Sequence, residues 1–406
     1  MIREISERES WDKLVCENGG HPLQLFAWGE LKSREKTWVA KRVAIYDEEE
    51  CFLGGAQILR RRLPFPFREM WYVPRGPFFA KVKNREKVLK EVADFAKKSE
   101  AMELKIEPNI LRAKDLFNQK NENVARGKFT KSRENDFADA KLGSLLGAQD
   151  DNLNVAKEED LTEENGERKV ARNDDTDDFI EILRKSGFRE SSSHVFIAKT
   201  IWLDLTKNED DILVEMSKKT RQYIRKSEKD GVAVREISNE NDLRKVLKIY
   251  AETAARDGFA KHCDEYYLNL AKIGGSANQI WLAEKDGQEL AFLWNFATPE
   301  ICFELYGGNN REGQNLRANY ILKWRAISFA KKQGSRIYDL NGLLNDGVSN
   351  FKLGFSDGRE TNLVGTWDFP LSRKYFAWEK MLPGAKKVVQ RMNKIRDLAR
   401  NSRKGK

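Results

Sequence analysis

"QIWLAEKDGQELAFLWNFA", residues 279–297, reads as two apolar strands joined by an acidic turn. A stretch with the same pattern, "RVAIYDEEECFLGGAQILRR", occupies residues 42–61. Each stretch predicts an antiparallel hairpin, because two strands joined by so short a turn must run in opposite directions. The recurrence of this pattern far along the chain indicates that the sequence contains an internal repeat.

The elements that follow the two hairpins also come in the same order. After residues 42–61 the chain predicts a strand in "EMWYVPRGPF", a helix in "NREKVLKEVADFAKKS" and a strand in "AMELKIEP". After residues 279–297 it predicts a strand in "EICFELYGGN", a helix in "LRANYILKWRAISFAKKQG" and a strand in "SRIYDLNG". Matching elements are offset by roughly 235 residues, which indicates duplication. A hairpin with a crossover helix onto a further strand predicts an α/β fold with mixed sheets.

Length and composition favour two domains and an anionic partner. The chain has 406 residues, of which 40% are hydrophobic, and this length is large for one core. Its 73 Lys and Arg residues outnumber its 64 Asp and Glu residues, which favours nucleic acid, nucleotide phosphate or anionic lipid as a partner. We expect a first domain over residues 1–199, a second over residues 200–370 and a basic helical tail over residues 371–406.

Several classes of protein are disfavoured. The start of the chain, "MIREISERES", lacks the apolar core of a signal peptide, and no apolar run approaches the ~20 residues that span a bilayer. The four cysteines form no CxxC pair, and the three histidines lack the spacing of metal ligands. We therefore expect a cytoplasmic protein with reduced thiols and no metal site.

Two charged segments stand apart from the patterned regions. Residues 112–178 contain no Trp or Tyr and show no sustained period, which predicts a surface insertion or mobile loop. Residues 384–406 hold nine Lys or Arg and one Asp, hence a net charge of +8. Apolar residues at near-helical spacing among them predict an amphipathic helix on the inner face of an anionic membrane, with tRNA phosphates as the alternative partner.

Residues 206–232, "TKNEDDILVEMSKKTRQYIRKSEKDGV", predict one long helix. Asn208 suits its N-cap, and Gly231 suits its C-terminal end. One face is apolar, and the opposite face carries only basic residues: Lys218, Arg221, Arg225 and Lys229. Because no acidic residue interrupts this stripe, an anion-binding role competes with that of a solvated face.

Residues 350–355, "NFKLGF", predict a strand. Because side chains alternate along a strand, Phe351, Leu353 and Phe355 would share one buried face. Lys352 would stand on the other face, beside a glycine that has no side chain to shield it. A lysine fixed in so bare a place is a candidate for catalysis.

Together these motifs resemble the FemABX aminoacyltransferases, which build the peptide cross-bridges of peptidoglycan. "LFAWGELK" is similar to the family's opening motif, and "GGAQILRRRLP" and "YVPRGPFF" are similar to its first-domain strands. "KKTRQYIRKSEKDGV" resembles its basic helix, and "LYGGN", "ANYILKWRAISFAKKQGSRIYDLNG" and "NFKLGF" resemble its second-domain signature. The resemblance spans almost the whole chain apart from the insertion and the tail. It implies two tandem GNAT-like (acyl-CoA N-acyltransferase-like) domains, which agrees with the repeat. The region from residue 232 to residue 278 is too short for the long helical hairpin of some members, so the chain resembles the compact, FemX-like ones.

The resemblance also implies a reaction. An aminoacyl-tRNA would donate its amino acid to an amine on the stem peptide of a peptidoglycan precursor, either UDP-MurNAc-pentapeptide or lipid II. Such a reaction needs no cofactor, and a monomer is expected. An amine attacking an ester passes through a tetrahedral oxyanion, which a fixed cation stabilises. The family position that matches Lys352 is implied to supply this cation, with Phe351 shaping the pocket.

Further site residues follow from the same resemblance. Lys32 and Arg221 match positions implied to contact the nucleotide diphosphate, whereas Arg225 is added from the basic stripe and not from the family. Tyr306 either lines the peptide channel or packs in the core. Asp339 either holds or deprotonates the incoming amine, or makes a structural hydrogen bond.

Two rival functions remain open. A CoA-dependent N-acyltransferase on the same fold would carry an [RQ]xxGx[GA] loop that cradles pyrophosphate at a helix start. The sequence "NNREGQNLRAN" fits it poorly, because Gly313 follows Arg311 by two residues. A non-catalytic RNA-binding protein would offer exposed aromatic and basic clusters, and none is evident.

Overall fold

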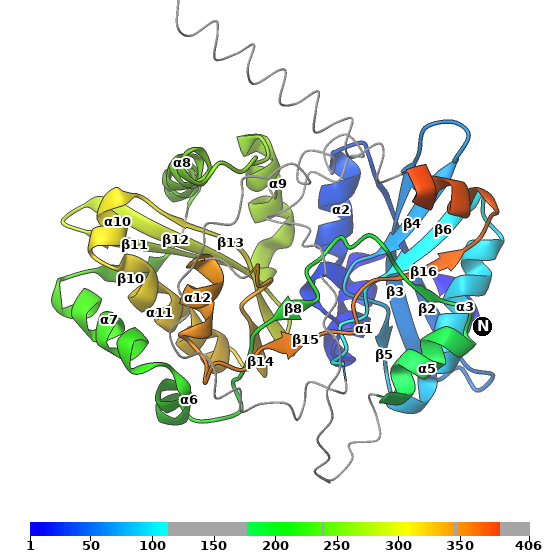
Figure 1. Cartoon of the computed structure of the whole chain (residues 1–406), viewed down its shortest axis with the longest axis horizontal. Helices are drawn as coiled ribbons and strands as arrows, with labels where there is room; N and C mark the ends of the chain where they lie inside the picture. The colour runs from blue at the N-terminus through cyan, green and yellow to red at the C-terminus, as the bar shows by residue number, and fades with distance from the viewer. Residues whose placement is uncertain (113–176, 238, 345–346, 382–406) are drawn as a thin grey trace, which may run out of the picture.

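Two β-sheets, one in each half of the molecule, form the frame of the fold (Figure 1). The structure is a computed structural model, and it describes residues 1–112, 177–237, 239–344 and 347–381. The predicted insertion and the predicted membrane-binding helix lie for the most part outside these residues, at 113–176 and 382–406. Among the described residues, no helix combines the length and the apolar character needed to cross a bilayer.

The first sheet is built around the first predicted hairpin. Strand β2 (Val39–Tyr46) pairs antiparallel with β3 (Phe52–Arg62), and β3 pairs antiparallel with β4 (Glu69–Val73). Helix α3 (Arg85–Lys97) then crosses to β6 (Ala101–Ile106), which is parallel to β4. Short strands β1 (Ile2–Glu4) and β5 (Phe78–Phe79) flank β2 and β3.

The second sheet repeats this pairing. Strand β11 (Asn278–Lys285) is antiparallel to β12 (Gln288–Ala297), and β12 is antiparallel to β13 (Ile301–Asn309). Helix α11 (Ala318–Lys332) crosses to β14 (Ile337–Asp339), which is parallel to β13. Strand β10 (Ala233–Glu236) extends the sheet beside β11. The two units therefore share one topology, and the predicted α/β fold with mixed sheets is confirmed.

Strands from distant parts of the chain complete both sheets. Strand β9 (Trp202–Asp204) pairs with β14 in the second sheet. Strand β16 (Trp367–Pro370) returns to the first sheet and lies between β6 and β7 (Arg189–Glu190). The sequence had assigned residues 367–370 to the second domain, whereas the structure places them in the first sheet. The chain passes between the two sheets once before β9 and once before β16. The strands β8 (Lys199–Thr200) and β15 (Thr361–Asn362) of these two connections pair with each other.

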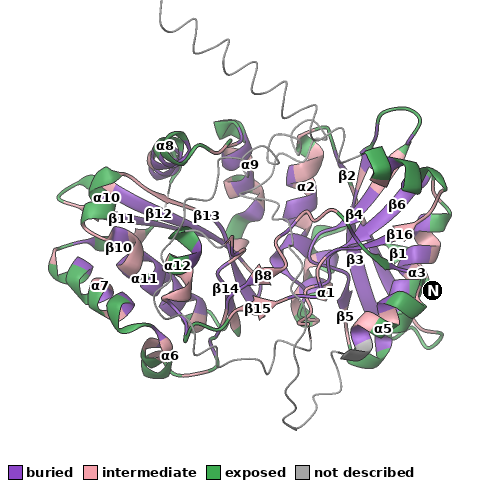
Figure 2. Ribbon diagram, in the orientation of Figure 1, coloured by how far each residue is buried: buried purple, intermediate pink, exposed green. Residues whose placement is uncertain are grey.

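The two halves share a hydrophobic core. Helix α2 (Phe26–Arg34) of the first half packs against α9 (Asp264–Gly274) of the second, with α1 (Arg8–Glu17) beside α2 and α8 (Glu240–Asp257) beside α9. The strands of both sheets are largely buried (Figure 2). One buried cluster joins Trp11 and Trp28 to Tyr267 and Trp294. Short 3-10 turns complete this region: η1 (Pro22–Gln24), η2 (Val82–Asn84) and η5 (Gly275–Ala277). A shared core of this kind holds the halves in a fixed relative position.

The predicted long helix over residues 206–232 is wrong in one respect, because it is two helices. Helix α6 (Glu209–Glu215) starts at Asn208, whose side chain accepts a 2.8 Å hydrogen bond from the Asp211 amide. Helix α7 (Lys218–Lys229) starts at Ser217, whose hydroxyl accepts from the Thr220 amide. Ser217 is a second N-cap, and it breaks the helix that the periodicity alone predicts to continue.

The predicted strand over residues 350–355 is also wrong. These residues end helix α12 (Gly347–Leu353). Phe351 and Phe355 are four residues apart, so a helical turn brings their ring centres to 5.2 Å from each other. A strand would also have placed the two rings on one face. A Cβ at Gly354 would lie 2.5 Å from the Thr220 hydroxyl, so this glycine permits close packing against α7.

A buried charged network crosses the first sheet. Lys105 on β6 is 4% exposed and forms an ion pair with Asp368 on β16, and the Ser191 hydroxyl donates to Asp368 at 2.6 Å. Glu103, which is 2% exposed, lies beside this network. Burial raises the pKa of Glu103 to about 7, the Lys105 ammonium opposes the shift, and the Asp368 carboxylate adds to it.

This raised pKa predicts that Glu103 makes stability fall as pH rises. The folded protein holds the Glu103 proton more tightly than the unfolded chain does, so the stabilisation present at low pH is lost between about pH 4.5 and pH 7. We expect Glu103→Gln to change the free energy of unfolding more favourably at pH 8 than at pH 5, by roughly 2–3 kcal/mol. Urea unfolding at both pH values measures this. The matched control is the exposed Glu100→Gln, and an equal change at both pH values for Glu103→Gln would contradict the prediction.

The other elements complete the two layers. In the first half, α5 (Asp177–Lys185) packs against α3. In the second half, the five-residue helix α10 (Arg311–Asn315) precedes α11. Residues 374–381 form a helix that covers the first domain, where Tyr375 and Trp378 are buried on it. The start of the predicted tail thus packs against the protein (Figure 1).

Candidate active site

Strand β14 pairs with β13 along its whole length of three residues and then ends. The register runs from Ile301–Ile337 to Phe303–Asp339, and β13 continues to Asn309 without this partner. A register shift opposite Trp294 and Asn295 lies just beyond the last paired residues. Because of this bulge, Glu304 contacts α11 while Tyr306 points into the interdomain core. Beyond Phe303, β13 has no strand partner on this side among the described residues, and the turn that follows β14 lies there.

The turn after β14 places Lys352. Asn341 adopts a left-handed backbone with φ of 57°, and its side chain donates to the Glu304 carbonyl at 3.0 Å. The Lys352 ammonium then donates to the carbonyls of Asn341 and Gly342, both at 2.8 Å. These two hydrogen bonds fix the ammonium beside the turn that follows β14. Lys352 comes from a helix and not from the predicted strand.

Aromatic rings pack around Phe351, the residue next to Lys352. Phe351 packs edge-on against Tyr320 at 5.0 Å, and Tyr320 packs in turn against Tyr223 of α7 at 5.0 Å. The Arg317 guanidinium lies 4.5 Å from the centre of the Tyr223 ring. A row of rings therefore leads from the basic helix α7 to the residue next to Lys352. The pocket-shaping role that the resemblance implied for Phe351 stays a prediction.

Asp339 is a hub of structural hydrogen bonds. It is fully buried, and it accepts from the Thr200 hydroxyl at 2.5 Å, the Trp202 indole at 2.9 Å and the Asn341 amide at 2.8 Å. These contacts favour the structural alternative over proton transfer from an amine. Asp339 holds the turn whose carbonyl holds Lys352, and it is therefore a positioning residue.

A buried ion pair lies next to Phe351. The Lys323 ammonium lies 2.5 Å and 2.6 Å from the two Glu304 oxygens, and the Tyr338 hydroxyl donates to Glu304 at 2.9 Å. Lys323 also lies 5.3 Å from the centre of the Phe351 ring. Burial lowers the pKa of Lys323, and the Glu304 carboxylate opposes this shift. Sequence reasoning missed the pair, because Lys323 reads as a surface residue of a basic helix.

Lys32 and Tyr306 belong to a second group on the interdomain face. The Lys32 ammonium donates to the Tyr266 hydroxyl at 2.9 Å, and it lies 4.5 Å from the centre of the Trp28 ring. The Tyr306 hydroxyl is 3.4 Å from that of Tyr266. Tyr306 is 2% exposed and packs in the core, so the structure supports the core alternative, while its hydroxyl joins a polar chain that ends at Lys32.

The structure separates Lys32 from Arg221. Figure 1 shows α2 at the domain interface and α7 at the outer side of the second domain. Arg221 donates to the carbonyls of Leu213, Val214 and Met216, which end helix α6. Arg256, which the sequence reasoning missed, donates to the Asn309 carbonyl at the end of β13.

These contacts predict different effects for the two arginines of α7. Arg221→Met should destabilise the protein by about 1–3 kcal/mol, because three carbonyls of α6 lose a charged donor. Arg225→Met should change stability by less than about 0.5 kcal/mol, because this side chain is exposed. Chemical denaturation of both variants measures the difference. Equal stability of the two variants would show that Arg221 does not hold α6.

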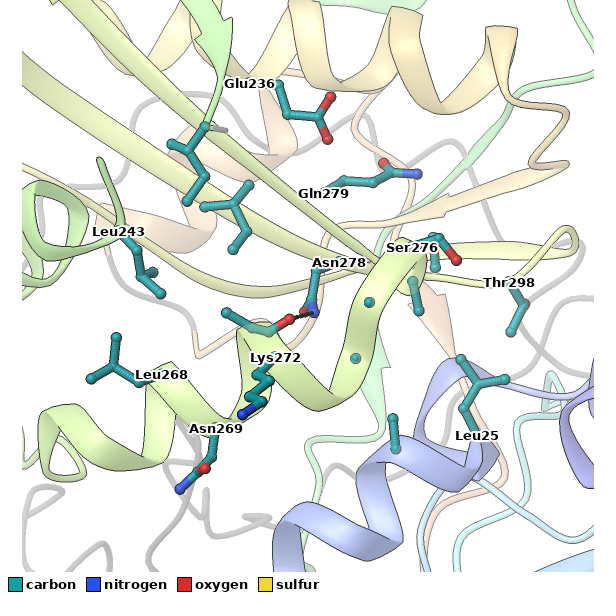
Figure 3. A pocket seen from close by; sticks show the side chains of 18 of the residues that line it. Leu25, Glu236, Leu243, Leu268, Asn269, Lys272, Ser276, Asn278, Gln279 and Thr298 are labelled. Atoms are coloured by element: carbon teal, nitrogen blue, oxygen red, sulfur yellow. Dashed lines mark hydrogen bonds between the residues drawn. The ribbon is translucent and has the colours of Figure 1, made fainter. Parts of the chain in front are cut away.

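A separate pocket of about 1170 Å³ lies between the two halves (Figure 3). Leu25 of the first half faces Leu268, Asn269 and Lys272 of α9, and Asn278 donates to the carbonyls of Leu270 and Ala271 at the base of α9. None of the seven site residues predicted from the sequence lines this pocket. The pocket and the site at Lys352 are therefore distinct features. In the part of the chain that the structure describes, no group of three or more His, Cys, Asp and Glu side chains could hold a metal ion.

The two units of the fold repeat one topology, and a lysine fixed by two carbonyls lies beside the end of β14 in the second unit. The FemAB family profile matches residues 8–141, 156–291 and 282–382, and the chain belongs to the FemAB family. A crystal structure of FemX superposes with a TM-score of 0.70 at 17% identity, covering 93% of this chain and 99% of that one. The structure of L-PGS from Bacillus licheniformis superposes with a TM-score of 0.50 at 12% identity, over 95% and 96% of the two chains. The predicted fold and the predicted family are both confirmed.

Two curated relatives are named transferases. The UDP-N-acetylmuramoylpentapeptide-lysine N(6)-alanyltransferase of Weissella viridescens is 25% identical over 262 residues, which cover 59% of this chain and 78% of the relative. The lipid II:glycine glycyltransferase of Staphylococcus haemolyticus is 23% identical over 364 residues, which cover 80% and 81% of the two chains. The predicted enzyme class, an acyltransferase, is confirmed.

Proposed function

We propose that this protein transfers an amino acid from aminoacyl-tRNA to an amine on the stem peptide of a peptidoglycan precursor, either UDP-linked or lipid-linked. The observation that carries the proposal is the Lys352 ammonium, held by two carbonyls of the turn that follows β14, beside β13. The names of the two relatives support the acceptor class, because one acts on a UDP-linked and the other on a lipid-linked precursor.

Lys352 acts on the charge that develops during the reaction. The amine nitrogen bonds to the ester carbonyl carbon, and the carbonyl oxygen becomes an oxyanion. A preorganised ammonium stabilises this oxyanion more than it stabilises the neutral ester, so it lowers the barrier. The intermediate then collapses, the bond from carbon to the ribose oxygen breaks, and an amide remains.

The proton balance needs no metal or cofactor. The proton lost by the attacking amine equals the proton gained by the leaving ribose hydroxyl. Asp339 is an unsuitable carrier, because donors occupy both of its oxygens and it is fully buried. We assign the carrier role to a phosphate of a substrate, since both substrates are rich in phosphate.

The surface beside Lys352 suits the end of a tRNA. Helix α7 exposes Lys218, Lys219, Arg225 and Lys229, which can bind backbone phosphates. The row from Tyr223 through Tyr320 to Phe351 runs from this helix to the residue next to Lys352, and unpaired bases stack on such rings. The precursor is placed on the interdomain side, where Lys32 carries a cation suited to a diphosphate.

The rival reading, a CoA-dependent N-acyltransferase, is disfavoured by the loop before α11. The Gly313 amide donates to the Asn310 side chain at 2.8 Å, so it is not available to a pyrophosphate. A Cβ at Gly313 would lie 2.2 Å from the Leu290 carbonyl, so the glycine serves packing against β12.

A transfer assay with labelled aminoacyl-tRNA tests the proposal. Full-length protein is mixed with total tRNA charged with labelled amino acids and with UDP-MurNAc-pentapeptide or lipid II. We expect label to leave the RNA and appear on one precursor only when enzyme and precursor are both present. Label transfer from acetyl-CoA, with none from charged tRNA, would support the rival instead.

A further inference from the structure

The loop between β3 and β4, residues 63–68, presents one aromatic ring to solvent. Phe65 at its tip is 97% exposed, whereas Leu63 and Phe67 on either side are buried against Met102 and Trp378. Figure 1 shows this loop at one end of the first domain, with the helix of residues 374–381 beside it. One exposed ring is common on protein surfaces, so its surroundings decide whether it belongs to an interaction site.

The loop is held in this form by its own contacts. The Leu63 amide donates to the Arg68 carbonyl at 2.7 Å, and the Phe67 amide donates to the Pro64 carbonyl at 2.9 Å. The Lys374 ammonium donates to the Pro66 carbonyl at 2.9 Å, which ties the loop to the helix of residues 374–381. The exposed ring is therefore preorganised to project outwards.

Apolar and basic side chains surround the tip. The helix of residues 374–381 adds Phe376, which is 45% exposed, and Met381, which is 54% exposed. Exposed basic residues of the loop, its flanks and this helix are Arg62, Arg68, Arg373, Lys374 and Lys380. Three acidic residues are near, and each has a partner: Glu69 pairs with Arg60, Glu100 pairs with Arg68, and Glu379 accepts from Ser192. In sequence, residues 384–406 follow this helix, and they carry a net charge of +8.

We propose that this face, defined by Phe65, Phe376, Met381 and the five basic residues, docks on an anionic phospholipid bilayer. The apolar tips enter the interface between headgroups and acyl chains, and the basic side chains bind headgroup phosphates. An apolar signal combined with a basic one is the pairing that stable peripheral attachment needs. A protein partner would need a pocket for the ring, whereas a bilayer accepts it without one. The face does not depend on the transfer reaction, and it holds none of the residues assigned to that reaction.

Vesicle sedimentation of the full-length protein tests this face. Vesicles of phosphatidylcholine mixed with phosphatidylglycerol are compared with vesicles of phosphatidylcholine alone, at low salt. We expect binding to the anionic vesicles only. Phe65→Ser should weaken this binding about tenfold, because the apolar anchor is lost. Phe65→Trp should bind as well as the original protein, since Trp favours membrane interfaces.

Matched variants separate this face from general stickiness. Val214→Ser removes a side chain that is 72% exposed on α6, and it should leave binding unchanged. Arg62→Gln with Arg373→Gln should weaken binding more than Lys81→Gln with Lys83→Gln, which removes the same charge elsewhere on the first domain. Binding of Phe65→Ser equal to that of the original protein would overturn the proposal, and so would loss of tRNA binding, rather than vesicle binding, in this variant. Transfer to a soluble UDP-linked precursor should stay unchanged in Phe65→Ser, so failure of the docking face and failure of the transfer reaction can be told apart.

Discussion

Lys352→Met should lower kcat by about 10²–10³-fold while leaving KM for the acceptor within a few-fold. The substitution keeps a side chain of similar length and removes the charge. Because the oxyanion exists only in the transition state, its loss of stabilisation should appear in kcat and in kcat/KM together. Steady-state kinetics over a range of acceptor concentrations, with saturating donor, measures both constants.

A matched control guards against a structural explanation. Lys331 also donates a hydrogen bond to a carbonyl, that of Leu205 at 2.9 Å, but it lies at the far end of α11. Lys331→Met should leave kcat unchanged. Circular dichroism must show both variants folded. An increase in KM with unchanged kcat for Lys352→Met would make Lys352 a binding residue and remove its catalytic role.

Lys323→Met should destabilise the protein by about 3–5 kcal/mol, because Glu304 would be left charged and buried. The side chains of the pair are 5% and 8% exposed, so water cannot replace the lost ammonium. Removing both charges, as Lys323→Met with Glu304→Gln, should recover part of this loss, since no unpaired charge then remains. Chemical denaturation at neutral pH gives the free energies of unfolding.

The same helix offers the control for this ion pair. Arg325 pairs with Glu228 at 2.7 Å, but both side chains are more than half exposed. Arg325→Met should cost less than about 1 kcal/mol. If Lys323→Met costs no more than Arg325→Met, the buried pair does not support the site below Phe351.

The parts of the fold that local pattern controls were predictable. Each hairpin of the repeat combines two apolar runs with an acidic turn, and both formed where the pattern placed them. The strand predicted for residues 350–355 was wrong because Phe351 and Phe355 satisfy a period of two and a helical spacing equally well. The assignment of residues 367–370 to the second domain was wrong because their pairing with β6 joins segments more than 250 residues apart. No local pattern reports such a pairing.

The candidate site was predictable in its cation but not in its supports. Lys352 could be named from its motif, whereas Asn341 could not, because its role depends on a left-handed backbone and on a contact with Glu304. Asp339 was named as a possible proton acceptor. Its burial under Thr200 and Trp202 comes from residues more than 130 positions earlier in the chain. Tertiary contacts, and not the motif, thus decide between a structural and a chemical role for this carboxylate.

Fragmentation mass spectrometry of the product tests the central claim most directly. Full-length protein is incubated with charged total tRNA and UDP-MurNAc-pentapeptide or lipid II, and the precursor is recovered and fragmented. The account predicts a mass increase of one or more amino acid residues, joined by an amide bond to an amine of the stem peptide, and a much slower increase with Lys352→Met. An unmodified precursor in both reactions, or modification that proceeds equally fast without Lys352, would contradict it.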